Sequence, residues 1–143
     1  MKRSLTPMLL SVICLSLFGL SCSETEQLNP VQGKVLHKDK PLSGATVTLH
    51  PKGQGGLNVV PAVGLTKEDG TFTLATGDKQ GAAVGDYVVT IICSRIPKGK
   101  KPIGTGGPEA IDILNGAYAS RDHSKITVTI KAGDNQLPPF KLK

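Results

Sequence analysis

The sequence predicts an all-β domain in which six or seven short strands form two packed sheets. Apolar, mostly β-branched residues alternate with polar residues in several separate segments, which is the two-residue period of a half-buried strand. Gly, Asp, Asn and Pro separate these segments, as expected for tight turns. No long stretch repeats apolar residues at the spacing of an amphipathic helix. Short strands separated in this way favour a two-sheet sandwich.

The strand pattern is clearest in five segments. Residues 31–37 (VQGKVLH) alternate strictly, whereas residues 86–93 (DYVVTIIC) are apolar on both faces, which predicts a central strand. The other three segments are 45–51 (ATVTLHP), 71–76 (TFTLAT) and 125–132 (KITVTIKA). We expect an aliphatic core with aromatic contributions from Phe72, Tyr87, Tyr118 and Phe140.

A long connection between residues 95 and 124 interrupts the strand pattern. Its length is far above the roughly 4 to 6 residues of an ordinary connection. Within it, GGPEAIDILNG predicts a short helix, with Pro108 in the first turn, Glu109 at the positive end and Gly116 as the terminator. Such a loop either carries a binding site or covers the edge of a sheet, and the sequence favours neither.

The N-terminus has the features of an export signal. Lys2 and Arg3 precede an uncharged apolar run, Met8 to Leu20, which ends in small residues. A membrane-spanning helix needs about 20 apolar residues, so the run is too short to span. The alternative, a buried N-terminal helix of the domain, is disfavoured because no polar residues pattern the run into an amphipathic face.

Cys22 lies two residues after the apolar run and is the predicted lipidation site. The residues Gly19-Leu20-Ser21-Cys22 resemble the bacterial lipobox, whose cysteine is acylated after cleavage, although that motif usually has an aliphatic residue at the position of Gly19. Gly19 and Ser21 also satisfy the rule for ordinary signal cleavage, which would release a soluble protein. We favour the lipobox, with residues 1–21 as signal peptide, 22–30 as polar tether and 31–143 as the folded domain.

Cysteine usage and charge agree with an exported protein. Of the three cysteines, Cys14 leaves with the signal, Cys22 is the anchor, and Cys93 lies in an apolar strand as a buried thiol. The residue after the anchor, Ser23, lacks the aspartate that often retains lipoproteins in an inner membrane, so we expect the outer membrane. The chain has 17 Lys and Arg against 11 Asp and Glu, and this mild positive excess does not indicate nucleic-acid binding.

Four motifs in order resemble carboxypeptidase regulatory-like domains. They are VQGKVLHKDKPLSGATVTLHP, GLTKEDGTFTL, VGDYVVTI and the closing segment AYASRDHSKITVTIKAGDNQLPPFKL, which together span residues 31–142. The resemblance implies a seven-stranded, immunoglobulin-like or prealbumin-like sandwich that is usually non-catalytic. It also implies that the last strand contains an aromatic residue. It also implies similarity to small bacterial lipoproteins that carry this domain.

No catalytic, cofactor-binding or metal-binding residue is predicted. The three histidines have no ligand spacing, and Glu68-Asp69-Gly70 offers too few oxygens for calcium and is predicted to be a turn. Hydrolases that share the prealbumin-like fold resemble one another by a C-terminal Tyr-Arg-Gly-Ser, whereas this chain ends in FKLK. Dioxygenases of that fold hold iron with two tyrosines and two histidines, and this chain has these residue types without a recognisable spacing. The candidate interaction loop contains Arg95, Lys98, Lys100 and Lys101, which bind an anionic partner or are simply solvated.

The sequence therefore predicts a membrane-anchored, non-enzymatic envelope lipoprotein. Its partners are the lipid bilayer, through Cys22, and an envelope protein or polymer, and its sandwich acts as a structural or protein-interaction module. The alternative is a domain that binds carbohydrate or another small ligand at the cell surface. Sugar sites usually need exposed aromatic platforms, and the chain has no Trp and only 3% aromatic residues.

Overall fold

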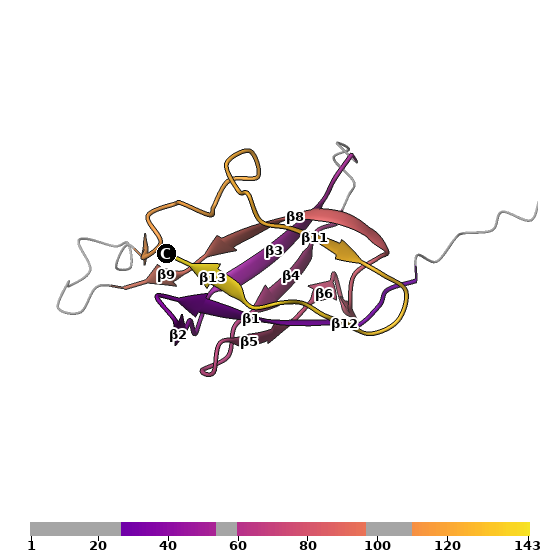
Figure 1. The fold of residues 1–143 in the computed structure, drawn as a ribbon, viewed down its shortest axis with the longest axis horizontal. Coiled ribbons are helices and arrows are strands. Elements are labelled where there is room, and N and C mark those ends of the chain that lie inside the picture. The colour runs from indigo at the N-terminus through magenta and orange to yellow at the C-terminus, as the bar shows by residue number, and fades with distance from the viewer. Residues whose placement is uncertain (1–26, 54–59, 97–109) are drawn as a thin grey trace, which may run out of the picture.

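The computed structural model describes residues 27–53, 60–96 and 110–143, and all regular structure in these ranges is β. The predicted signal peptide, Cys22 and three lysines of the interaction loop, Lys98, Lys100 and Lys101, lie outside the described residues. The described chain enters the domain at one end and its C-terminus lies at the other (Figure 1). We call these the near end and the far end.

The larger sheet is antiparallel and has six strands. Its spatial order is β11 (Thr127–Ile130), β8 (Gly85–Ile92), β3 (Thr46–Pro51), β4 (Ala62–Leu65), β6 (Ala75–Thr76) and β7 (Lys79–Gln80). β8 lies inside this sheet, as its two apolar faces predicted.

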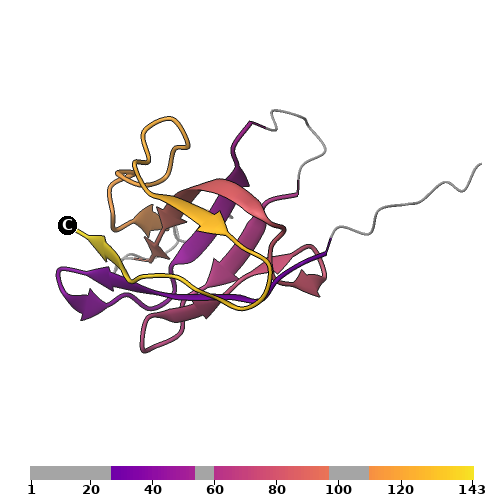
Figure 2. The same ribbon diagram turned by 45° about the vertical axis from the view of Figure 1, so that its right-hand side comes forward.

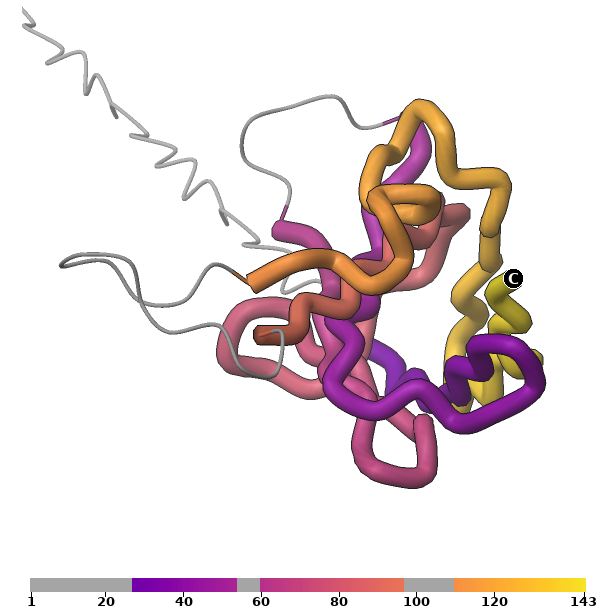
Figure 3. Tube along the Cα trace, turned by 90° about the vertical axis from the view of Figure 1, so that its left-hand side faces the viewer, coloured from indigo at the N-terminus to yellow at the C-terminus, as the bar shows by residue number. Residues whose placement is uncertain are grey.

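The second sheet is built around one long strand, β1 (Val31–His37). Two strands from the end of the chain, β12 (Asn135–Gln136) and β13 (Phe140–Leu142), pair with β1 in parallel. β2 (Lys40–Pro41) and β5 (Thr71–Thr73) pair with it antiparallel. Figure 2 shows this layer below the larger sheet, and Figure 3 looks onto the far end, where β13 lies beside β1.

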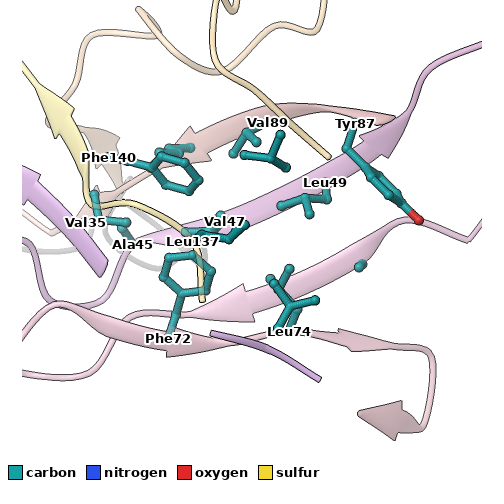
Figure 4. Packing of buried hydrophobic residues seen from close by; sticks show 14 of the residues in the cluster. Val35, Ala45, Val47, Leu49, Phe72, Leu74, Tyr87, Val89, Leu137 and Phe140 are labelled. Atoms are coloured by element: carbon teal, nitrogen blue, oxygen red, sulfur yellow. The ribbon is translucent and has the colours of Figure 1, made fainter. Parts of the chain in front are cut away.

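The core lies between the two sheets and is mainly aliphatic, as predicted. Inward residues alternate with outward ones along β1, β3 and β11. Phe72 and Phe140 stack with their ring centroids 6.0 Å apart, and Figure 4 shows both rings between the sheets. Tyr87 is buried as well and its hydroxyl donates to the carbonyl of Ala83 at 2.8 Å. The predicted all-β sandwich is therefore confirmed.

Gly33 makes room for the largest buried ring. It lies directly opposite Phe72 in the antiparallel pair of β1 and β5. A Cβ atom on Gly33 would come within 2.5 Å of Cζ of Phe72 and within 2.8 Å of its Cε1. The phenyl ring therefore occupies the space that a side chain on β1 would need.

The predicted helix in the long connection is wrong where the structure describes it. Ile111–Asp112 forms strand β10, which pairs with β9 (Ser94–Arg95), and turns follow to residue 119. Asn115 has a positive φ of 53°, which the interior of a helix does not tolerate. The predicted start at Pro108 and Glu109 lies outside the described residues.

The folded part begins before β1. Asn29, which the sequence analysis placed in the tether, is buried and forms a β-bridge with Ala82 at the near end. Its side-chain Oδ1 accepts the N–H of Gly133 at 2.8 Å. The N-terminal segment is therefore fastened to two loops before the first long strand starts.

Candidate functional site

The outer face of the larger sheet carries exposed aliphatic side chains on β4 and β8, with threonines of β3 between them. Leu65 of β4, Thr46 of β3 and Ile92 of β8 lie in one row, and Val63 and Thr48 lie in the next row. Leu65 is 64% exposed and Ile92 39% exposed. We call these residues, Thr46, Thr48, Val63, Leu65 and Ile92, the outer-face patch. None of them is ionisable.

The strand directions place this patch toward the far end. β8 begins shortly after Ala82, which bridges Asn29 at the near end, and it finishes at Ile92. β3 and β4 are antiparallel to their neighbours, so Thr46 starts its strand and Leu65 ends its strand at the same level. In Figure 1, β8 runs from the side where the chain enters to the side that bears the C-terminus.

The described part of the long connection covers the free edge of β8. Beyond β11, the N–H groups of Val89 and Ile91 donate to the carbonyls of Ile126 and Tyr118, both at 2.9 Å. Leu114, from the same connection, is buried in the core. Residues 110–126 therefore protect the sheet edge, which is one of the two roles that the sequence left open.

Tyr118 also connects this covering segment to the other sheet. Its hydroxyl oxygen accepts the N–H of Lys143 at 3.1 Å, directly after β13. Its ring is partly buried against the core, and its carbonyl accepts the N–H of Ile91 in β8. One residue thus contacts both layers at the side of the sandwich.

Asp112 holds the turn that follows β10. Its Oδ1 accepts the N–H groups of Cys93 at 3.0 Å and Leu114 at 3.1 Å, and its Oδ2 accepts the N–H of Gly116 at 2.9 Å. Partial burial alone would raise the pKa of Asp112, but these three N–H groups outweigh it and hold the pKa below its ordinary value. The carboxylate therefore organises the backbone in place of the predicted helix.

His50 lies on the same outer face as the patch, nearer to the near end. Its Nε2 is 3.0 Å from the hydroxyl of Thr90, a residue that is only 4% exposed. Arg121, from the connection, donates to the carbonyl of Pro51 at 3.3 Å. Burial, and then the positive charge of Arg121, lower the pKa of His50.

We expect acid to weaken the fold through His50. Because its folded-state pKa lies below its unfolded value, the neutral ring is favoured in the fold. Its contribution is complete above about pH 6.5 and is lost as the pH falls from there toward the folded pKa. Urea unfolding at about pH 7.5 and about pH 5 should show a smaller pH dependence for His50→Gln than for the native chain. An unchanged pH dependence in His50→Gln would show that His50 does not cause the loss of stability in acid.

Other residues singled out in the sequence have structural roles. Asp69 accepts both the backbone N–H and the hydroxyl of Thr71, at 3.0 and 2.7 Å, and Gly70 has φ of 78°, so the predicted turn is confirmed. Cys93 is fully buried, as predicted. Arg95 is exposed and donates to the carbonyl of Ser43 at 2.9 Å.

No cluster of metal ligands is found among residues 27–53, 60–96 and 110–143. The histidines do not share an element, since His37 ends β1, His50 lies in β3 and His123 lies in an exposed turn. The described residues include no helix that is long and apolar enough to cross a membrane.

Sequence reasoning missed the outer-face patch and the role of Asp112. The signal for the patch was present in the segment that forms β8, where consecutive isoleucines, Ile91 and Ile92, place one apolar side chain on each face. Asp112 gave no comparable signal, because its contact with the N–H of Cys93 forms only when β9 and β10 pair.

No protein-family model matches the chain, and no curated protein matches it. Among solved structures, a DUF3823 family protein from Parabacteroides merdae is similar over 80% of this chain and 45% of its own, with 15% identity and a TM-score of 0.41. A 9R-lipoxygenase from Cyanothece matches over 82% of this chain and 17% of its own, with 14% identity and a TM-score of 0.43. The plantain pollen allergen Pla l 1 matches over 80% and 92%, with 20% identity and a TM-score of 0.37. This chain spans less than half the length of the first two, and no activity follows from likenesses this distant.

Proposed function

We propose that this chain is a lipid-anchored, non-enzymatic protein of the cell envelope whose carboxypeptidase regulatory-like sandwich binds another protein. The observation that carries the proposal is the outer-face patch, whose aliphatic and threonine side chains are uncharged and lie on the outer surface of the larger sheet, toward the far end. Contiguous exposed apolar side chains on a soluble domain are typical of protein interfaces.

A short segment joins the proposed anchor to the near end of the domain. Cys22 precedes Gln27, the first described residue, by five residues. At about 3.3 Å per residue, that segment spans at most about 17 Å. Acylation of Cys22 would hold the near end toward the bilayer, in the outer membrane as the sequence predicts. The outer-face patch would then face the aqueous space of the envelope.

The non-enzymatic part of the proposal is supported by the structural roles of the ionisable groups whose pKa values are shifted. Asp112 accepts backbone N–H groups, Asp69 accepts from Thr71, and His50 is partly buried near the positive charge of Arg121. Each of these pKa shifts is accounted for by a structural contact, which is the usual alternative to a catalytic role. The aliphatic character of the patch favours a protein partner over a sugar.

The anchor is tested first, by the intact mass of the native protein from a membrane fraction. We expect the mass of residues 22–143 with a diacylglyceryl group and an acyl group, and we expect Cys22→Ala to abolish the modification. The burial of several acyl chains explains retention in the membrane. Recovery of an unmodified 22–143 chain in the soluble fraction would contradict the anchor.

The interaction surface is tested by a photo-crosslinking amino acid placed in intact cells. At position 65, in the patch, we expect a discrete covalent adduct. At position 73, an exposed threonine of β5 on the other sheet, we expect none. Equal labelling at both positions, or no adduct at position 65, would rule the patch out as the binding surface.

A further inference from the structure

We propose that the outer-face patch binds a second copy of this chain in the same membrane. This inference rests on the proposed anchor at Cys22 and goes further, because it names the partner. Its three grounds are the small size of the patch, its lack of charge and its position on the domain.

The patch is too small for a stable interface between freely diffusing proteins. It has far fewer residues than the roughly 20–30 on each side of a standard interface. A weak contact of this kind becomes populated when both partners are confined, because tethering raises their effective concentration. Copies held in one membrane by the same short segment meet this condition without any further binding site.

The patch is compatible with an identical surface. Its threonine and aliphatic side chains carry no charge, so contact between the five patch residues of two copies would bring no like charges together. Sheets pack face to face at about 10 Å through such side chains, with strands inclined at about 30°. A patch that packs against itself forms an isologous, twofold interface, which is the commonest arrangement in soluble oligomers.

The position of the patch fits a twofold axis along the membrane normal. All copies would have the near end toward the bilayer, so their patches lie at the same height above it. The patch lies on a side face of the domain, the outer surface of the larger sheet, rather than at its tip. Two neighbouring copies can therefore turn these faces toward each other without detaching from the membrane.

Thr46 provides the test, because it lies between Leu65 and Ile92 in the first row and so lies near the proposed axis. The full-length lipidated Thr46→Cys protein is reconstituted in phosphatidylethanolamine–phosphatidylglycerol vesicles and treated with a short bismaleimide. Native Cys93 is buried and serves as the background. The matched control is Thr73→Cys, an exposed threonine on the outer surface of the other sheet.

We expect about tenfold more covalent dimer from Thr46→Cys than from Thr73→Cys. Adding Leu65→Asp should reduce the dimer to the control level, because it places like charges at the contact, whereas Val84→Asp, at an equally exposed valine near the start of β8, should not. Circular dichroism confirms that both aspartate variants are folded.

The contrary outcomes are distinct. Equal dimer from both cysteine variants, or persistence of the dimer with Leu65→Asp, would overturn self-association. An adduct with a different protein in cells, with no dimer in vesicles, would also overturn it and would leave the proposed function standing. Failure of the protein to acquire its lipid, seen by mass before reconstitution, would overturn both.

Discussion

Gly33→Ala should lower the free energy of unfolding by about 1–3 kcal/mol, because the new methyl group overlaps the ring of Phe72. The Cβ position is 2.5 Å from Cζ and 3.3 Å from Cε2 of that ring, which is fully buried and stacked on Phe140. A close-packed interior leaves the ring no neighbouring space, so either the ring or β1 must shift. Urea unfolding monitored by circular dichroism measures the loss, with Gln32→Ala in the same strand as the surface control.

A double-mutant cycle shows whether the clash with Phe72 is the cause. Phe72→Leu should itself cost about 1–3 kcal/mol, since it removes buried ring atoms. It also removes the atoms that meet the new methyl group, so adding Gly33→Ala to Phe72→Leu should cost less than about 1 kcal/mol. Additive costs in the double variant would show that Gly33 is required for its backbone and that the clash is irrelevant.

The sequence predicted those parts of the fold that a local pattern determines. The alternation in residues 31–37 and 125–132 placed Val35 and Ile130 inward, because a strand turns successive side chains to opposite faces. The turn at Asp69 and Gly70 was equally local, since the carboxylate bonds to the backbone two residues on.

Short strands and non-local contacts explain what the sequence did not predict. Strand β4 has only four residues and includes Gly64, so it is too short to show a clear period. Parallel pairing of β13 with β1 joins segments about a hundred residues apart, and nothing near Phe140 reveals it. The same reason hid most of the candidate site, since the outer-face patch exists only when β3, β4 and β8 lie side by side.

Specific binding through the outer-face patch requires that the open edge of the larger sheet be covered. Residues 110–126 cover the edge of β8, and without them its unpaired N–H and C=O groups could pair with any extended chain. A specific contact through the outer-face patch therefore requires that the covering segment stay in place. Asp112 is the residue whose contacts hold the start of this segment against the end of β8.

Asp112→Asn should cost about 1–3 kcal/mol of unfolding free energy and should expose the edge of β8. An amide oxygen can still accept from Cys93 and Leu114, but its NH₂ group would face the N–H of Gly116, which now donates to Oδ2. Native-state hydrogen exchange should show loss of protection first at Ile91 and Ile113, whose N–H groups donate to the carbonyls of Tyr118 and Cys93 and so join this segment to the end of β8. Asp122→Asn, in an exposed turn of the same connection, is the control.

The pH dependence of the unfolding free energy distinguishes the effect of the charge of Asp112 from the effect of its shape. Its folded pKa is below the unfolded value, so its contribution is complete above about pH 4 and is lost as the pH falls through the folded pKa. Unfolding free energies at about pH 6 and about pH 3 should therefore converge between the native chain and Asp112→Asn. A difference that persists at the lower pH would mean that the carboxylate acts through its shape and packing alone. The charge-assisted bonds to Cys93, Leu114 and Gly116 would then not be what keeps the edge of β8 covered.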